Sequence, residues 1–278
     1  MSQSVDLSGP RTKLARASEL RGELANHIQQ TLEPVENRPS VALGVDNATK
    51  EHILYVDRVP DLPGFLPRVG ILVGDIVHNM RSSLDHLVFQ LALVNTAGKV
   101  VHPERTQFPI CDTPQQYMRA AANNLSEVAQ HDARIIQGFQ PYCPMDENVS
   151  VGVYFHPLAM LRDLSNQDKH RSIAPVLIPS TGLDLRGPAE SLALGLIVMD
   201  IARKMIQGSE PRAEAMVPGL VIARFPFTLE ATSQLPQPAG FALPAVGFPD
   251  GRSVLAVLDK IGRAVDSVIS AFDDLGEK

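Results

Sequence analysis

The chain has 278 residues and a formal net charge of −6 at pH 7, and 44% of its residues are hydrophobic and 20% charged. These proportions are close to those of globular proteins and exclude wholesale disorder. The negative charge argues against a broad basic surface for duplex DNA or anionic lipid. Trp is absent, and four Tyr and ten Phe leave little material for an aromatic platform that stacks single-stranded bases.

The chain carries no sign of a targeting or membrane segment. Its first ten residues are polar and lack the basic region and apolar stretch that a signal peptide requires. The longest apolar run, Leu192–Met199, is much shorter than the roughly 20 residues that a membrane-spanning helix needs. Cys111 and Cys143 form no CxxC pair and are expected to be reduced packing residues. We therefore expect a cytoplasmic protein with no membrane partner.

The first third of the chain has three clear elements. After an N-terminus that is expected to be disordered over residues 1–12, Lys13–Leu32 repeats apolar residues about four positions apart, which predicts an amphipathic helix. His52–Val59 is rich in β-branched and aromatic residues, which predicts a strand. The turn-rich connector Pro60–Pro67 follows. A long central helix is then expected over Arg68–Val94.

The remainder alternates shorter helices with strands. Thr113 is expected to cap a helix that has Pro114 in its first turn. Helices are expected over residues 113–124, 126–138, 156–166 and 253–275, and strands over residues 173–178, 191–199 and 220–227. The Pro-rich stretch Thr232–Pro249 is expected to be a surface connection.

These elements predict an α+β fold. The N-terminal, central and C-terminal helices each have one apolar face, which favours a helical bundle. A small, mainly antiparallel sheet is expected from residues 52–59 and 172–228. The simplest organisation is one domain over residues 13–278, and a division near residue 150 is the alternative. No segment repeats at a fixed period, which argues against a solenoid.

The polar face of the central helix is the strongest functional signal. Imidazoles, short carboxylates and amides occupy positions where Glu, Lys and Arg would be typical of a solvent-exposed face, although they are weaker helix formers. At about 100° per residue, the polar side comprises Asp75, His78, Asn79, Ser82, Asp85, His86 and Gln90, and the apolar side Val73, Ile76, Val77, Met80, Leu84, Leu87 and Leu91. This pattern indicates a surface with a function beyond solubility.

Arg81 and His86 stand in an R-x4-H arrangement on this helix. The spacing resembles the signature of HEPN ribonucleases, helical-bundle proteins that cleave RNA without a metal. The resemblance implies that Arg81 braces the phosphate through its planar guanidinium and that His86 acts as general acid or base. The structural alternative is that both residues serve ion pairs or packing.

A second polar cluster covers Arg162–Arg171. Basic residues near the carboxyl end of a helix complement its dipole, which accounts for Lys169 and Arg171. It does not account for Asn166, Asp168 and His170, which we expect to point into a cleft where the helix ends.

Four short motifs resemble a widespread group of uncharacterised bacterial proteins. Their recurring pattern is LRSxLDH, then FPI, QPY and DKHR. Here the matching segments are Arg81–His86, Phe108–Ile110, Gln140–Tyr142 and Asp168–Arg171, and the chain departs from the pattern at Met80, where Leu is usual. The resemblance implies no established activity.

Three functions follow from these clusters. The first is a HEPN-like endoribonuclease in which Lys169, His170 and Arg171 supply positive charge to RNA. The second is a non-catalytic protein that binds a small polar ligand or a peptide through His78, Asp85, Asp168 and Arg171.

The third function is a metal-dependent hydrolase of the helical-bundle type. The chain lacks an HExxH motif or comparable ligand spacing, so no metal ligand and no cofactor is assigned. A homodimer is left open. Because opposite charges in one partly buried site would explain both clusters, we expect Asp85 and His86 to contact a member of Asn166–Arg171.

Overall fold

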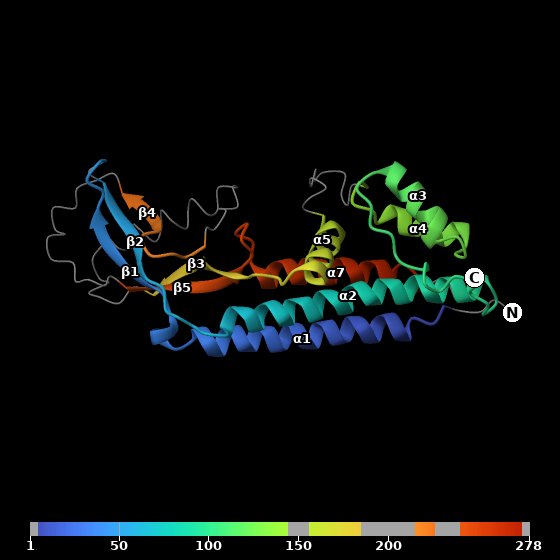
Figure 1. Cartoon of the computed structure of the whole chain (residues 1–278), viewed down its shortest axis with the longest axis horizontal. Coiled ribbons are helices and arrows are strands. Elements are labelled where there is room, and N and C mark those ends of the chain that lie inside the picture. The colour runs from blue at the N-terminus through green and yellow to red at the C-terminus, as the bar shows by residue number, and fades with distance from the viewer. Residues whose placement is uncertain (1–4, 50, 144–155, 185–214, 226–239, 274–278) are drawn as a thin grey trace. The chain divides into compact units, whose positions relative to one another are not determined.

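The structure, a computed structural model, describes residues 5–49, 51–143, 156–184, 215–225 and 240–273 (Figure 1). It is an α+β fold with a helical bundle and a small antiparallel sheet, as the sequence predicts. No helix among these residues combines the length and apolar character needed to cross a membrane.

The chain divides into two compact units, each assembled from segments that are distant in sequence. Unit 1 comprises Met1–Leu24, Gly70–Ile173 and Ala256–Lys278. Unit 2 comprises Ala25–Val69 and Ala174–Leu255. The candidate site residues all lie in unit 1.

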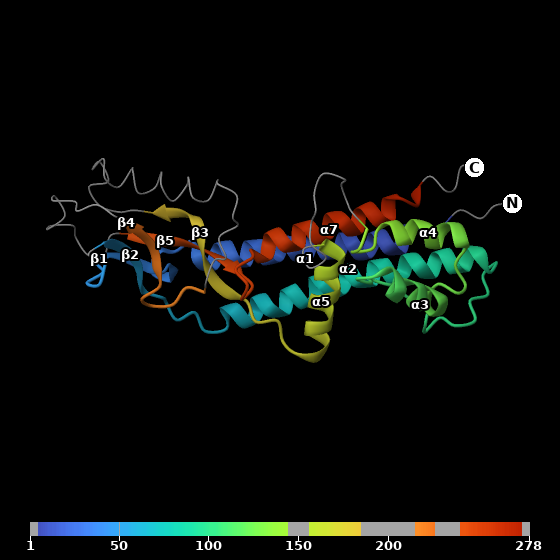
Figure 2. The ribbon, with the colours of Figure 1, turned by 90° about the horizontal axis from the view of Figure 1, so that it is seen from above.

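Three long helices form the bundle: α1 (Ser8–Leu32), α2 (Phe65–Asn95) and α7 (Val254–Ser270). Their unit 1 parts run side by side (Figures 1 and 2). The predicted apolar face of α2 is confirmed, since all seven of its members are buried. Helix α1 begins earlier than predicted, so residues 8–12 are helical and not disordered. The Asp6 carboxylate accepts the Ser8 amide hydrogen at 2.9 Å and supports this start.

Polar and close-packing contacts join α1 and α7 to the rest of the bundle. The buried Ser83 hydroxyl of α2 donates to the Pro10 carbonyl of α1 at 2.7 Å. The Arg21 guanidinium of α1 donates two hydrogen bonds to Asp259 of α7, at 2.9 and 2.7 Å. Gly262 of α7 lies so near α2 that an added Cβ would be 3.3 Å from the Met80 methyl group. The predicted packing of these three helices is therefore confirmed.

Among the described residues, unit 1 also contains three shorter helices: α3 (Pro114–Asn124), α4 (Gln130–Gly138) and α5 (Pro157–His170). The predicted cap of α3 is confirmed, because the Thr113 hydroxyl accepts the Gln116 amide hydrogen at 3.2 Å. Helix α4 begins four residues later than the predicted Ser126, since a turn precedes it. Helix α5 extends one turn beyond its predicted end, so most of the second polar cluster is helical.

The described part of unit 2 contains a sheet of five antiparallel strands in the order β3-β5-β1-β2-β4. They are β1 (Ser40–Val45), β2 (His52–Arg58), β3 (Val176–Asp184), β4 (Val221–Phe225) and β5 (Gly240–Gly247). The predictions for β2, β3 and β4 are confirmed with shifted ends. The predicted strand at 191–199 lies outside the described residues.

The surface connection predicted for Thr232–Pro249 is wrong where β5 lies. Strand β5 pairs with both β3 and β1, and Pro244 is opposite Pro179 in the β3–β5 register. Proline lacks the amide hydrogen that a strand pair normally uses, so a Pro-rich sequence predicts a connection. Here Pro244 and Pro179 are partners at the same position of the β3–β5 register.

Candidate functional site

Arg81 and Asp85 form an ion pair one turn apart on α2 and hold the backbone of Phe108. The Arg81 Nη2 donates to Asp85 Oδ1 at 2.9 Å and to the Phe108 carbonyl at 2.6 Å. Asp85 Oδ1 accepts the Phe108 amide hydrogen at 2.9 Å. The Phe108 ring is fully buried. Both backbone polar groups of a buried residue are thus satisfied by the ion pair.

Gln140 holds the same segment from the other side. It is fully buried, and its amide nitrogen donates to the carbonyls of Pro109 and Ile136, at 2.9 and 3.1 Å. Its amide oxygen accepts the Cys111 amide hydrogen at 2.9 Å. Side chains of the LRSxLDH and QPY motifs therefore bind backbone groups of the FPI motif and of Cys111, the residue that follows it. Sequence reasoning singled out these motifs but did not identify this structural role.

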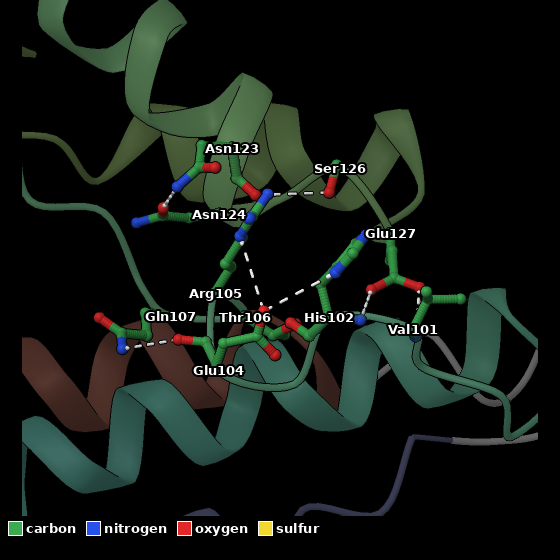
Figure 3. Close-up of polar contacts among 10 residues, drawn as sticks. All are labelled: Val101, His102, Glu104, Arg105, Thr106, Gln107, Asn123, Asn124, Ser126 and Glu127. Carbon is green, nitrogen blue, oxygen red and sulfur yellow. Dashed lines mark hydrogen bonds and ion pairs between the residues drawn. The ribbon is translucent and has the colours of Figure 1, made fainter.

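The loop that leads into Phe108 is held at its other end by Glu127 (Figure 3). The Glu127 carboxylate accepts the amide hydrogens of Val101 and His102, at 2.7 and 2.9 Å. These two hydrogen bonds lower the pKa of Glu127. The connection from α2 to α3 is therefore a fixed segment, and the polar face of α2 beneath it is partly covered.

His86 contacts a different neighbour from Arg81. It is exposed, and a Cβ added to Gly9 of α1 would be 3.4 Å from its Nδ1. Residues five apart on a helix are separated by about 140° around its axis. Arg81 therefore faces the Phe108 segment, whereas His86 lies beside the start of α1. Within one chain, the two residues of the R-x4-H arrangement are not brought together.

The end of α5 meets α2 at Gly74. Helix α5 crosses α2 (Figures 1 and 2), and the Asp168 carboxylate lies so close to Gly74 that an added Cβ would be 2.3 Å from Oδ1. Asp85 is eleven residues further along α2, a rise of about 16 Å. In the described part of the chain, no hydrogen bond or ion pair joins Asp85 or His86 to Asn166–Arg171. The predicted contact of Asp85 and His86 with Asn166–Arg171 is therefore not found among the hydrogen bonds and ion pairs of the described residues, and α5 meets α2 at Gly74 instead.

This contact defines one exposed surface, which we call the α2–α5 surface. It comprises Asp75 and His78 of α2 together with the end of α5 and its cap, Asn166–Arg171, and each of these residues is exposed. His78 lies one helical turn after Gly74, so it is on the side of α2 that Asp168 approaches. Within the described ranges, the side chains of His78, Asp168, Lys169, His170 and Arg171 form no hydrogen bond or ion pair.

Two other potentially reactive side chains of unit 1, Cys111 and Tyr117, are buried and serve packing. Burial raises the pKa of the Cys111 thiol and of the Tyr117 phenol, so both stay protonated near neutral pH. The Tyr117 hydroxyl donates to the Ala133 carbonyl and ties α3 to α4. No group of three or more His, Cys, Asp or Glu side chains is placed to hold a metal ion among the residues that the structure describes.

Comparison of the chain with family models, curated proteins and solved structures finds no match in any of the three.

Gly74→Ala tests the contact between α2 and Asp168. Ala in place of a helix-interior Gly stabilises by about 0.5–1 kcal/mol where the Cβ has room. Gly22 of α1 has no heavy atom within 4 Å of an added Cβ, so Gly22→Ala should show this gain in urea unfolding. Gly74→Ala should gain less, because the Asp168 side chain must rotate away, and the NMR signals of Asp168 should shift. An equal gain without such a shift would contradict the contact.

Proposed function

We propose that this chain is a non-catalytic binding protein that takes a small polar ligand or a peptide on the α2–α5 surface. The observation that carries the proposal is the approach of Asp168 to Gly74. It joins His78 and the end of α5 in one exposed patch whose charged groups have no intramolecular partners within the described residues. A surface maintained for solubility alone has no need of a glycine in the middle of a long helix.

The charges of this surface favour a ligand with both donors and acceptors. Asp168 offers a carboxylate that accepts hydrogen bonds from an ammonium or amide group. Lys169 and Arg171 offer cations for a carboxylate or phosphate, and neighbouring residues on a helix point about 100° apart. A peptide or amino acid carries both kinds of group, whereas a purely anionic or cationic ligand would meet a like charge.

The contacts of Arg81 favour binding over phosphodiester cleavage. Its Nε and Nη2 are engaged with Asp85 and Phe108, and its side chain is 18% exposed. His86 faces the start of α1 and lies apart from Arg81. General acid-base catalysis on a phosphate that Arg81 braces would require both groups at one reacting centre. The ribonuclease function thus stays the second candidate, supported by the exposed imidazole of His86.

An NMR titration tests the binding proposal. The probes are free amino acids, short mixed-sequence peptides and nucleoside monophosphates, added to the ¹⁵N-labelled full chain. The shifts should gather at His78 and residues 166–171 and should be lost in Asp168→Asn. The matched control is Arg119→Ala, which removes an exposed cation from α3 and should leave the shifts unchanged.

Incubation with mixed single-stranded and structured RNA, with and without EDTA, tests the enzymatic alternatives. The binding proposal expects no cleavage. Cleavage that survives EDTA and is lost in His86→Ala and Arg81→Lys would replace the proposal by the ribonuclease function. Cleavage abolished by EDTA would instead favour the metal-dependent hydrolase.

A further inference from the structure

His156 caps the start of α5 and is almost fully buried. Its side chain is in the N-cap position, where its Nδ1 accepts the Leu158 amide hydrogen at 3.2 Å. The residue is 5% exposed, and Pro157 follows it as the first residue of the helix. An imidazole that accepts through Nδ1 must be neutral, with its proton on Nε2.

Protonation would remove this cap. A proton on Nδ1 would oppose the Leu158 amide hydrogen, and a cation at a helix N-terminus is unfavourable because the helix dipole is positive there. Within the described residues, the charged group whose field reaches His156 is Lys260 of α7, which is also cationic. Burial and, secondarily, Lys260 lower the pKa of His156 from 6.5 to about 4.

The first turns of α5 form its anchor in unit 1. Its N-terminal residues from Pro157 to Leu161 are all buried, whereas every residue from Asn166 to His170 is exposed. Loss of the cap therefore acts on the buried end of the helix, from which the exposed end extends.

We infer that His156 makes the attachment of α5 acid-sensitive, so that its protonation releases the first turn of the helix and loosens the end that lies against Gly74. The inference is independent of the proposed ligand. Because the pKa of His156 is lower in the folded than in the unfolded chain, its contribution to stability is complete above pH 6.5 and is lost as the pH falls toward 4.

Urea unfolding of wild type and His156→Asn at pH 7.5 and pH 5 tests this inference. Asn keeps an N-cap acceptor but does not titrate, so it is the matched control. Between the two pH values, the unfolding equilibrium constant of the wild type should rise about 30-fold more than that of the variant, the factor expected for a pKa of about 4 against 6.5. Equal acid losses in the two proteins would overturn the inference.

Direct titration of the His156 imidazole by NMR in the wild-type chain needs no variant. A midpoint near 4, accompanied by shifts of the amides at the start of α5 but not of α3, is expected. A midpoint near 6.5 with unchanged α5 amides would overturn the inference even if His156→Asn failed to fold.

Discussion

Deletion of Ser253–Lys278 should abolish cooperative unfolding of the chain. The removed segment contains α7, whose apolar side is almost completely buried in the bundle. The buried residues of the removed segment that belong to unit 1 are Val257, Leu258, Ile261, Val265, Val268 and Ile269 of α7, and Phe272 after it. Complete burial of one such side chain is worth about 1.5–3 kcal/mol, so their sum matches or exceeds the 5–15 kcal/mol that typically separates folded from unfolded domains.

Circular dichroism during thermal unfolding measures the effect of the deletion. The truncated chain should be insoluble or should lose its helical signal gradually without a defined midpoint. Ile261→Ala should give an intermediate result, with a loss of about 2–5 kcal/mol for a fully buried Ile. The exposed Arg263→Ala on the same helix should change the free energy of unfolding by less than about 0.5 kcal/mol. A truncated chain that still unfolds cooperatively would contradict the role assigned to α7.

The long helices could be predicted because their apolar period alone determines which face is buried. Every apolar residue assigned to the inner side of α2 is buried. The strands are harder to predict from the sequence, because a short strand gives little periodic signal. The sequence does not predict strand β1, and it predicts a connection in place of β5 because Pro244 and its neighbours are typical of a loop. Both were stabilised by pairing with strands distant in sequence, which a local pattern cannot represent.

The candidate site was predicted only in part, because spacing along a helix does not reveal the neighbours of each residue. Arg81, Asp85 and His86 lie within two turns, yet they contact two different segments, Phe108 and Gly9. The meeting of Asp168 with α2 depends on the crossing of α5. A signal for it was present in Gly74, a residue that is unfavourable in a helix interior unless another group approaches closely.

Gln140→Ala should lower the free energy of unfolding by about 3–5 kcal/mol, the range for loss of a buried side chain combined with unsatisfied buried polar groups. The Gln140 amide is the sole link between α4 and the backbone of both Pro109 and Cys111 among the described hydrogen bonds. Its removal leaves the buried Cys111 amide hydrogen without an acceptor. It should also weaken the hold of Arg81 and Asp85 on Phe108, since these two side chains and Gln140 restrain one short segment.

Urea unfolding of three variants separates this role from the general effect of an Ala substitution. The exposed Gln130→Ala at the start of α4 is the matched control and should cost less than about 0.5 kcal/mol. Gln140→Glu keeps the acceptor for Cys111 but loses the donor to Pro109 and Ile136, so its loss should be at least as large as that of Gln140→Ala, because a buried carboxylate would face two carbonyls. Hydrogen exchange at the Phe108 and Cys111 amides should accelerate in both Gln140 variants. If Gln140→Ala were as stable as Gln130→Ala, the FPI segment would not depend on Gln140, and the QPY motif would require another explanation.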